Sequence, residues 1–422
     1  MLPSAQFLRT AALLILAVMG PPSLWWTGVR LARALEGGTR TPPSHEQLSD
    51  YLTRDSEIST PQLREHVVWT RQSRMKVLRI AHDEAVLASA TEIVDLDLKT
   101  SSARADVGRD QLAALGIDDI SSIALAETPG QVWVYNWDSG RMTLLKLNSV
   151  PTVLRVVTVM PSLRSLHWNA GHLFVSGGSD TALVTVFDEP IAATSPGSVV
   201  KLNQIAVIGT PLFPGLTPVL SRSLNVTTLA QRPDGPELAA AFQWSNKIDV
   251  FDTDSMRLVR SISGPVESKL DFDIAKLAGK PLFTLNDRSM FSYTSVAGSR
   301  DTIVGLYSGR LRARYRGRMA AGDELHVFGW DGRACGAWRL HDQIDQIAFD
   351  EDRDVLYGLR NAEGASLVAL DFSDASFCNK PTDGKSNTGL RRKSKGDQQA
   401  RPTDSRSGPA AKAFPRPTTT SG

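Results

Sequence analysis

The sequence predicts an all-β protein built as a β-propeller, with six blades and seven as the alternative count. Apolar residues in most of the 422-residue chain alternate with a period of two, which is typical of strands. One unit of strand, turn and apolar strand recurs along the chain. Between two ends of different composition lie 345 residues, about 57 for each of six blades or about 49 for each of seven.

The recurring unit is clearest at 131–147, where the turn Asp138–Gly140 separates two apolar strands. Clear copies follow at 247–262 and 324–340, and weaker copies at 182–188 and 366–372. Another strand precedes each unit, at 123–126, 172–176, 238–242, 303–307 and 355–359. Such a sheet cannot cover its own faces, so the copies are expected to stack around an axis. A pair of sandwiched sheets is the alternative, but it would not require this internal copying.

The N-terminal segment, residues 1–34, has the pattern of a secretory signal. Arg9 precedes an apolar run at 11–20, Pro21 and Pro22 interrupt it, and Ala32–Ala34 offers small residues for cleavage. An uncleaved anchor that contacts the membrane through residues 11–29 is the alternative. Either reading predicts an exported protein, in the periplasm or at the cell exterior.

Residues 35–74 are predicted to be a linker with short helices, followed by the propeller at 75–379. A capping box at Ser44–Gln47 and the pair Thr60–Pro61 indicate one or two helices between about 45 and 72. The first strands are expected at Met75–Ala81 and Glu92–Leu98.

The C-terminal segment, residues 380–422, is predicted to be a disordered basic tail. It has few large apolar residues and carries ten Lys and Arg against three Asp. The 345 residues of the body carry 34 Lys and Arg against 42 Asp and Glu, so the basic pI belongs to the tail. An acidic body without a nucleic-acid-binding motif is not expected to bind nucleic acid.

Five arginines at alternate positions form the candidate binding site: Arg310, Arg312, Arg314, Arg316 and Arg318. On an extended strand their side chains would share one face, and the planar guanidinium suits carboxylates and phosphates. We therefore expect an anionic ligand or partner at the propeller rim. The alternative is a solvated loop in which the arginines pair with nearby acids.

Two cysteines, Cys335 and Cys378, lie 43 residues apart. In an oxidising compartment such a pair usually forms a disulfide, which would stabilise the fold by about 4 kcal/mol. Two separate buried thiols are the alternative.

Within residues 302–372 lie the segments Gly305–Arg310 (GLYSGR) and Leu325–Gly332 (LHVFGWDG), and the strand Val355–Tyr357 that follows an acidic turn. In these motifs the chain resembles the TolB-like six-bladed propeller family of exported bacterial proteins. The resemblance implies six blades and a location outside the cytoplasm. The shared residues are architectural, so the resemblance assigns no catalytic role, and this chain has no cysteine near its signal to carry a lipid.

The sequence contains no motif for a catalytic triad, a phosphate loop, a haem or a metal. Its seven histidines are scattered; His167 and His172 flank one turn, but no third ligand is evident. We therefore expect a monomeric binding module without a cofactor, whose partner is an envelope protein or an anionic small ligand. The alternatives are a lactonase-like hydrolase or lyase with a metal held by carboxylates in the axial channel, and a structural module anchored to the membrane.

Overall fold

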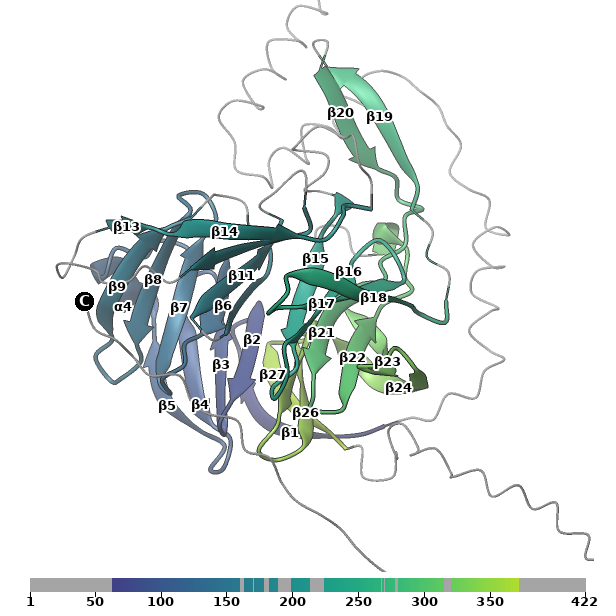
Figure 1. Cartoon of the computed structure of the whole chain (residues 1–422). Coiled ribbons are helices and arrows are strands. Elements are labelled where there is room, and N and C mark those ends of the chain that lie inside the picture. Colours follow the sequence, from purple (N-terminus) through teal and green to yellow (C-terminus); the bar gives the residue numbers. More distant parts are fainter. Residues whose placement is uncertain are drawn as a thin grey trace, which may run out of the picture. The chain divides into compact units, whose positions relative to one another are not determined.

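The computed structural model describes residues 63–159, 163–169, 171–177, 182–188, 199–212, 224–266, 268, 270–277, 280–314 and 320–371. These residues form six antiparallel sheets of four strands each, arranged as the blades of a propeller (Figure 1). A separate two-stranded sheet and a short parallel strand, β13, complete the described strands. The predicted all-β propeller is confirmed, and its blade count is six.

The first three blades follow the chain. Blade 1 contains β2 (Val77–Ala81), β3 (Glu84–Ala88), β4 (Ile93–Asp97) and β5 (Ser102–Val107). Blade 2 contains β6 (Ser122–Leu125), β7 (Gln131–Asn136), β8 (Arg141–Lys146) and β9 (Thr152–Thr158), with β13 (Val199–Lys201) on its outer edge. Blade 3 contains β10 (Leu166–Asn169), β11 (His172–Ser176), β12 (Val184–Asp188) and β14 (Asn203–Ile208).

The last three blades complete the ring. Blade 4 contains β15 (Thr227–Gln231), β16 (Glu237–Phe242), β17 (Lys247–Asp252) and β18 (Arg257–Ser263). Blade 5 contains β21 (Tyr293–Gly298), β22 (Thr302–Tyr307), β23 (Gly322–Gly329) and β24 (Ala334–Ile344). Blade 6 contains β25 (Gln346–Asp350), β26 (Val355–Arg360), β27 (Ala365–Asp371) and, as its outer strand, β1 (Arg64–Arg71).

The six inner strands contact one another in the order β2, β6, β10, β15, β21 and β25, and β25 contacts β2. Side chains of one blade satisfy exposed backbone groups of the next blade around this ring. Ser165 accepts a hydrogen bond from the Leu229 amide at 3.3 Å, and Ser295 accepts one from the Ile347 amide at 3.2 Å. Gln346 accepts one from the Leu78 amide at 2.9 Å. These contacts hold the inner edges together without a continuous sheet.

The hydrophobic core is divided among the six blade interfaces. Each interface holds one cluster of buried apolar side chains drawn from both neighbouring blades. The short helix α4 (Arg109–Ala114), between blades 1 and 2, adds Leu112 to the first of these clusters. Each blade therefore depends on its neighbours to cover both faces, as the repeat pattern predicted.

Strand β1 closes the ring by joining the two ends of the described chain. It pairs antiparallel with β27 from Arg64↔Asp371 to Arg71↔Ala365 (Figure 1). This strand lies within 35–74, where the sequence predicted a linker with helices. The part of the predicted helical range that the structure describes is a strand, because β27 offers it a complete hydrogen-bonded edge. The rest of that range lies outside the described residues.

The predicted hairpins are found where the sequence placed them. Strands β7 and β8, β17 and β18, and β23 and β24 match the three clear copies, and β12 and β27 match the weaker ones. The signal or anchor at 1–34 and the tail at 380–422 lie outside the described residues. Within the described part of the chain, no helix is long and apolar enough to cross a membrane.

Candidate functional site: the arginine loop, the hairpin arm and the propeller axis

The segment predicted to be an arginine-lined strand is a loop instead. This arginine loop, residues 308–321, connects β22 to β23 and turns at Gly309, whose φ is +59°. Residues Arg312–Arg314 form one turn of 3₁₀-helix, so Arg310, Arg312 and Arg314 do not alternate along a strand. In the described part of the loop, one bridge between Leu311 and Met290 is the only strand-like pairing, and five like charges on one face would repel one another. Arg316 and Arg318 lie outside the described residues.

Two of the arginines make contacts that hold the loop in place. Arg310 pairs with Asp323 at the start of β23. Arg312 donates from Nη1 to the Leu285 carbonyl at 2.7 Å, and the same atom lies 3.4 Å from Asp287 Oδ1. Arg314 is exposed. The structure thus gives Arg310 and Arg312 structural partners and leaves an anionic ligand at the loop untested.

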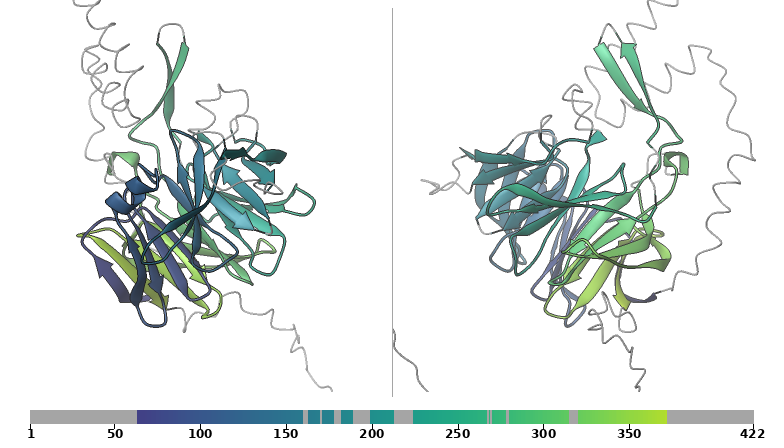
Figure 2. Two further views of the ribbon diagram at one scale, coloured as in Figure 1. Left: turned by 90° about the vertical axis from the view of Figure 1, so that its left-hand side faces the viewer. Right: turned by 45° about the vertical axis from the view of Figure 1, so that its right-hand side comes forward.

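One partner of Arg312, Leu285, ends a hairpin arm, which we define as β19 (Phe272–Leu277) and β20 (Lys280–Leu285), and the other, Asp287, follows it by two residues. The arm is inserted between blades 4 and 5, and its strands pair from Phe272↔Leu285 to Leu277↔Lys280. Both views in Figure 2 show it standing away from the blade sheets. The sequence reading missed the arm, although two apolar six-residue segments separated by Ala278 and Gly279 are a hairpin signal.

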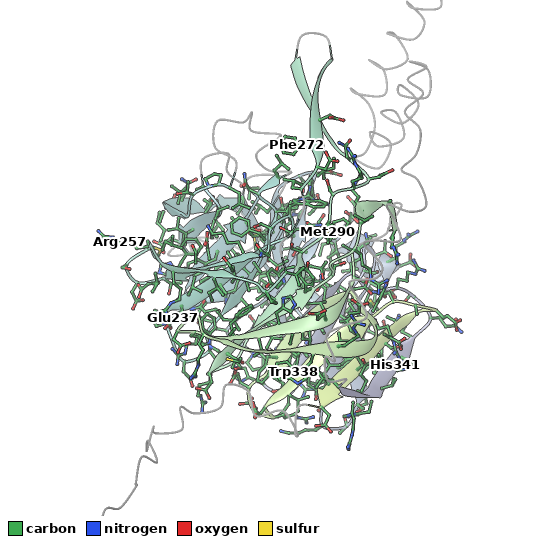
Figure 3. The ribbon with its side chains drawn as sticks, turned by 90° about the vertical axis from the view of Figure 1, so that its right-hand side faces the viewer. Glu237, Arg257, Phe272, Met290, Trp338 and His341 are labelled. Carbon is green, nitrogen blue, oxygen red and sulfur yellow. The ribbon has the colours of Figure 1, made fainter. Side chains whose placement is uncertain are left out.

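The base of the arm is fixed to the propeller by polar and apolar contacts. Asp271 accepts from Asn286 Nδ2 at 2.9 Å and pairs with Arg288 at 2.7 Å. Beneath it, a small separate core contains Leu285, Phe291 and Trp244, with the two rings stacked at 4.4 Å. Figure 3 labels Phe272 at the base of the arm and Met290 below it. The arginine loop, the base of the arm and this core therefore form one unit.

The propeller axis carries polar side chains from the inner strands. Arg79 lies in β2, His167 in β10 and Gln231 in β15. Burial, and then the nearby Arg79 charge, lower the pKa of His167 to about 4, although the neighbouring Gln231 opposes this shift. Among the six inner strands the only carboxylate is Asp350, fully buried at the last position of β25. The inner strands therefore do not supply the carboxylates that the predicted hydrolase site would need.

The remaining histidines have local partners rather than one common site. His326 is buried between blades 4 and 5, where Nδ1 lies 3.1 Å from the Tyr293 hydroxyl and Nε2 lies 2.8 Å from Glu324. His172 pairs with Asp188 at 2.9 Å. Within the described residues, no three His, Cys, Asp or Glu side chains are grouped as metal ligands would be.

Two buried carboxylates, Glu84 and Asp95, share the interface of blades 1 and 2. Glu84 accepts from the Gly130 amide at 3.0 Å. Burial, and then the charge of Glu84, raise the pKa of Asp95 to about 7. Asp95 therefore keeps its proton below that pH in the folded protein, while it would ionise above about pH 4 in the unfolded chain. This carboxyl stabilises the fold as the pH falls, opposite in sign to His167.

Of the predicted cysteine pair, the structure describes only Cys335. It lies in β24 against the apolar cluster between blades 5 and 6. Cys378 lies outside the described residues, so the bond between them stays a prediction.

Comparison with known proteins adds little to this picture. No family model matches the chain, and no curated protein matches it. Among solved structures the chain is similar to the β-propeller domain of Cps50 (Swd1) from Myceliophteria thermophila, with a TM-score of 0.42 and 12% identity. That similarity covers 73% of this chain and 100% of the other. The six-bladed architecture rests on the strand pairing, and the TolB-like resemblance stays a prediction.

We predict that Arg312→Ala loosens the arm, because it removes the guanidinium that donates to the Leu285 carbonyl. Hydrogen exchange followed by mass spectrometry should show at least tenfold faster exchange in peptides spanning 272–285. The matched control is Arg314→Ala, two residues away on the same turn and exposed. Equal exchange of the arm in both variants would contradict the role given to Arg312.

A second prediction concerns pH. His167 is neutral in the folded protein down to about pH 4, whereas an unfolded histidine takes up its proton near pH 6.5. The unfolded state then binds more protons in this window, so His167 costs about 3 kcal/mol of stability as the pH falls from 6.5 to 4. Urea unfolding should show a shallower loss of stability in His167→Gln than in the wild type. Replacement of the exposed His341 by Gln is the control (Figure 3), and a slope unchanged by His167→Gln would contradict the prediction.

Proposed function

We propose that this chain is an exported, non-enzymatic interaction module that binds an envelope protein through the hairpin arm and the arginine loop. The observation that carries the proposal is the arm itself: a two-stranded sheet, inserted between two blades and fixed at its base by Asp271 and Arg312.

The two-stranded sheet offers strand edges that stand away from the blade sheets (Figure 2). Among the described strands, neither β19 nor β20 pairs with a third strand, so each has an edge able to accept an added strand. An isolated hairpin is only marginally stable in water. Binding of an extended segment of the partner would therefore stabilise the arm as well as the complex.

The arginine loop adds charge beside the arm. Arg310 and Arg312 already face Asp323 and Asp287, whereas Arg314 is exposed. Arg314 would favour a partner with acidic residues next to the added strand. Arg316 and Arg318, which lie outside the described residues, add positive charge to the same loop. An anionic small ligand on the same arginines is the narrower form of this proposal.

The proposed location outside the cytoplasm rests on the sequence. The N-terminal signal pattern, the TolB-like resemblance and the pair Cys335–Cys378 all agree with export, and a disulfide would be expected to persist there. Retention of residues 11–29 as a membrane contact would place the same module at the membrane surface.

The experiment is a capture from envelope extracts with three forms of the full chain. The first is unaltered, the second has residues 272–285 replaced by a short Gly-Ser link, and the third carries Arg257→Ser on the outer strand of blade 4 (Figure 3). We expect one envelope protein to be retained by the first and third forms and lost at least tenfold by the second.

Identical partners for all three forms would overturn the arm as the binding element. Sequencing the N-terminus of the mature protein tests the export pattern, since cleavage predicts a start near Leu35. Metal analysis of the same preparation tests the hydrolase alternative, which requires a stoichiometric divalent ion.

A further inference from the structure

Arg79 occupies an unusual place for a charged residue. It is the central residue of β2, an inner strand, and Nη2 lies 3.4 Å from the Leu166 carbonyl on β10. The inner strand β6 stands between β2 and β10 in the order of the ring. The guanidinium therefore reaches past blade 2 and lies at the axis.

No carboxylate balances this charge within the described residues. The hydrogen bonds of Arg79 go to the Leu78 and Leu166 carbonyls. Burial lowers its pKa to about 10, and no acidic group acts in the opposite direction. By contrast, Arg71 and Arg353 each have acidic partners that raise their pKa. A half-buried guanidinium without an acidic partner is stabilised by an anion that binds beside it.

Two neutral polar side chains stand beside Arg79 at the axis. His167 lies close enough to Arg79, and to Gln231 on the next blade, for both residues to affect its pKa. Gln231 is only 8% exposed, and its Oε1 has no hydrogen-bond partner among the described residues. Both Arg79 and His167 remain partly exposed, so solvent reaches this part of the axis.

We propose that the propeller axis binds a small oxyanion, a phosphate or carboxylate group, on the guanidinium of Arg79 beside His167 and Gln231. Arginine presents a fork of donors that matches two oxygens of either group. A neutral imidazole offers a further N–H without a second charge. The unpartnered Gln231 oxygen favours an anion that also carries a hydroxyl, such as protonated phosphate, over a plain carboxylate.

This site is separate from the arm, so the two proposals succeed or fail independently. The protein partner is proposed to bind along an edge of the hairpin arm, whereas Arg79 lies on the inner strand of blade 1. A variant at Arg79 is expected to leave capture of the protein partner unchanged.

The test is titration calorimetry of the full chain with sodium phosphate and with sodium acetate, each against sodium chloride at matched ionic strength. We expect saturable binding, tighter for phosphate, that weakens at least tenfold in Arg79→Gln. The matched control, Arg257→Gln, removes the same charge from an exposed strand position and should bind like the wild type. Binding of neither anion, or equal binding by both variants, would overturn the site.

A measurement on the unaltered protein keeps the test decisive if Arg79→Gln does not fold. Crystals soaked in sodium selenate, a tetrahedral oxyanion with an anomalous signal, should show a peak within hydrogen-bond distance of the Arg79 guanidinium. Selenate peaks at other positions only would overturn the site.

Discussion

The pairing of β1 with β27 is the constraint on which the rest of the structure depends. A propeller blade covers one neighbour with each face, so an open ring would leave two faces and one strand edge in water. Here the outer strand of blade 6 comes from the opposite end of the described chain, and the hydrogen bonds from Arg64 to Arg71 fasten the ring. Each of the six apolar clusters then lies between two blades that cover it from both sides.

A closed ring explains how the fold can accept inserted elements that are free to bind a partner. The six interfaces and the bonded inner edges need little from the connecting loops, so the link between blades 4 and 5 can hold the hairpin arm. The base of the arm is nonetheless held in position by the contacts of Asp271 and Arg312. The axis is the second available place, and Arg79 makes it positively charged.

The strands that the sequence predicted best are those whose alternation is complete within a few residues, such as 131–147. Strand β1 could not be predicted in this way. Its residues include Arg64, Glu65 and His66, and its partner lies about 300 residues away in the chain, so a local helix signal at Thr60–Pro61 took precedence. The edge supplied by β27 decides its conformation.

The candidate sites show the same limit. The alternate spacing of the five arginines suggested a strand. Alternating charged residues give a strand no apolar face to bury, and the segment is a loop held by the Leu285 carbonyl and by Asp323. The Leu285 carbonyl belongs to an inserted hairpin more than 20 residues before the loop, and Asp323 comes directly after it. The hairpin arm could have been predicted from the sequence, since its two strands and its turn are local. The unbalanced charge of Arg79 could not, because it depends on which side chains the six blades bring together at the axis.

Native-state hydrogen exchange of the amides in β1 tests the closed ring most directly. If β1 is an integral strand, its amides paired with β27 exchange with the same free energy of opening as the inner strands β2 and β25, through global unfolding. Exchange of β1 at a much lower free energy, while those inner strands stay protected, would contradict the claim that this strand holds the propeller together.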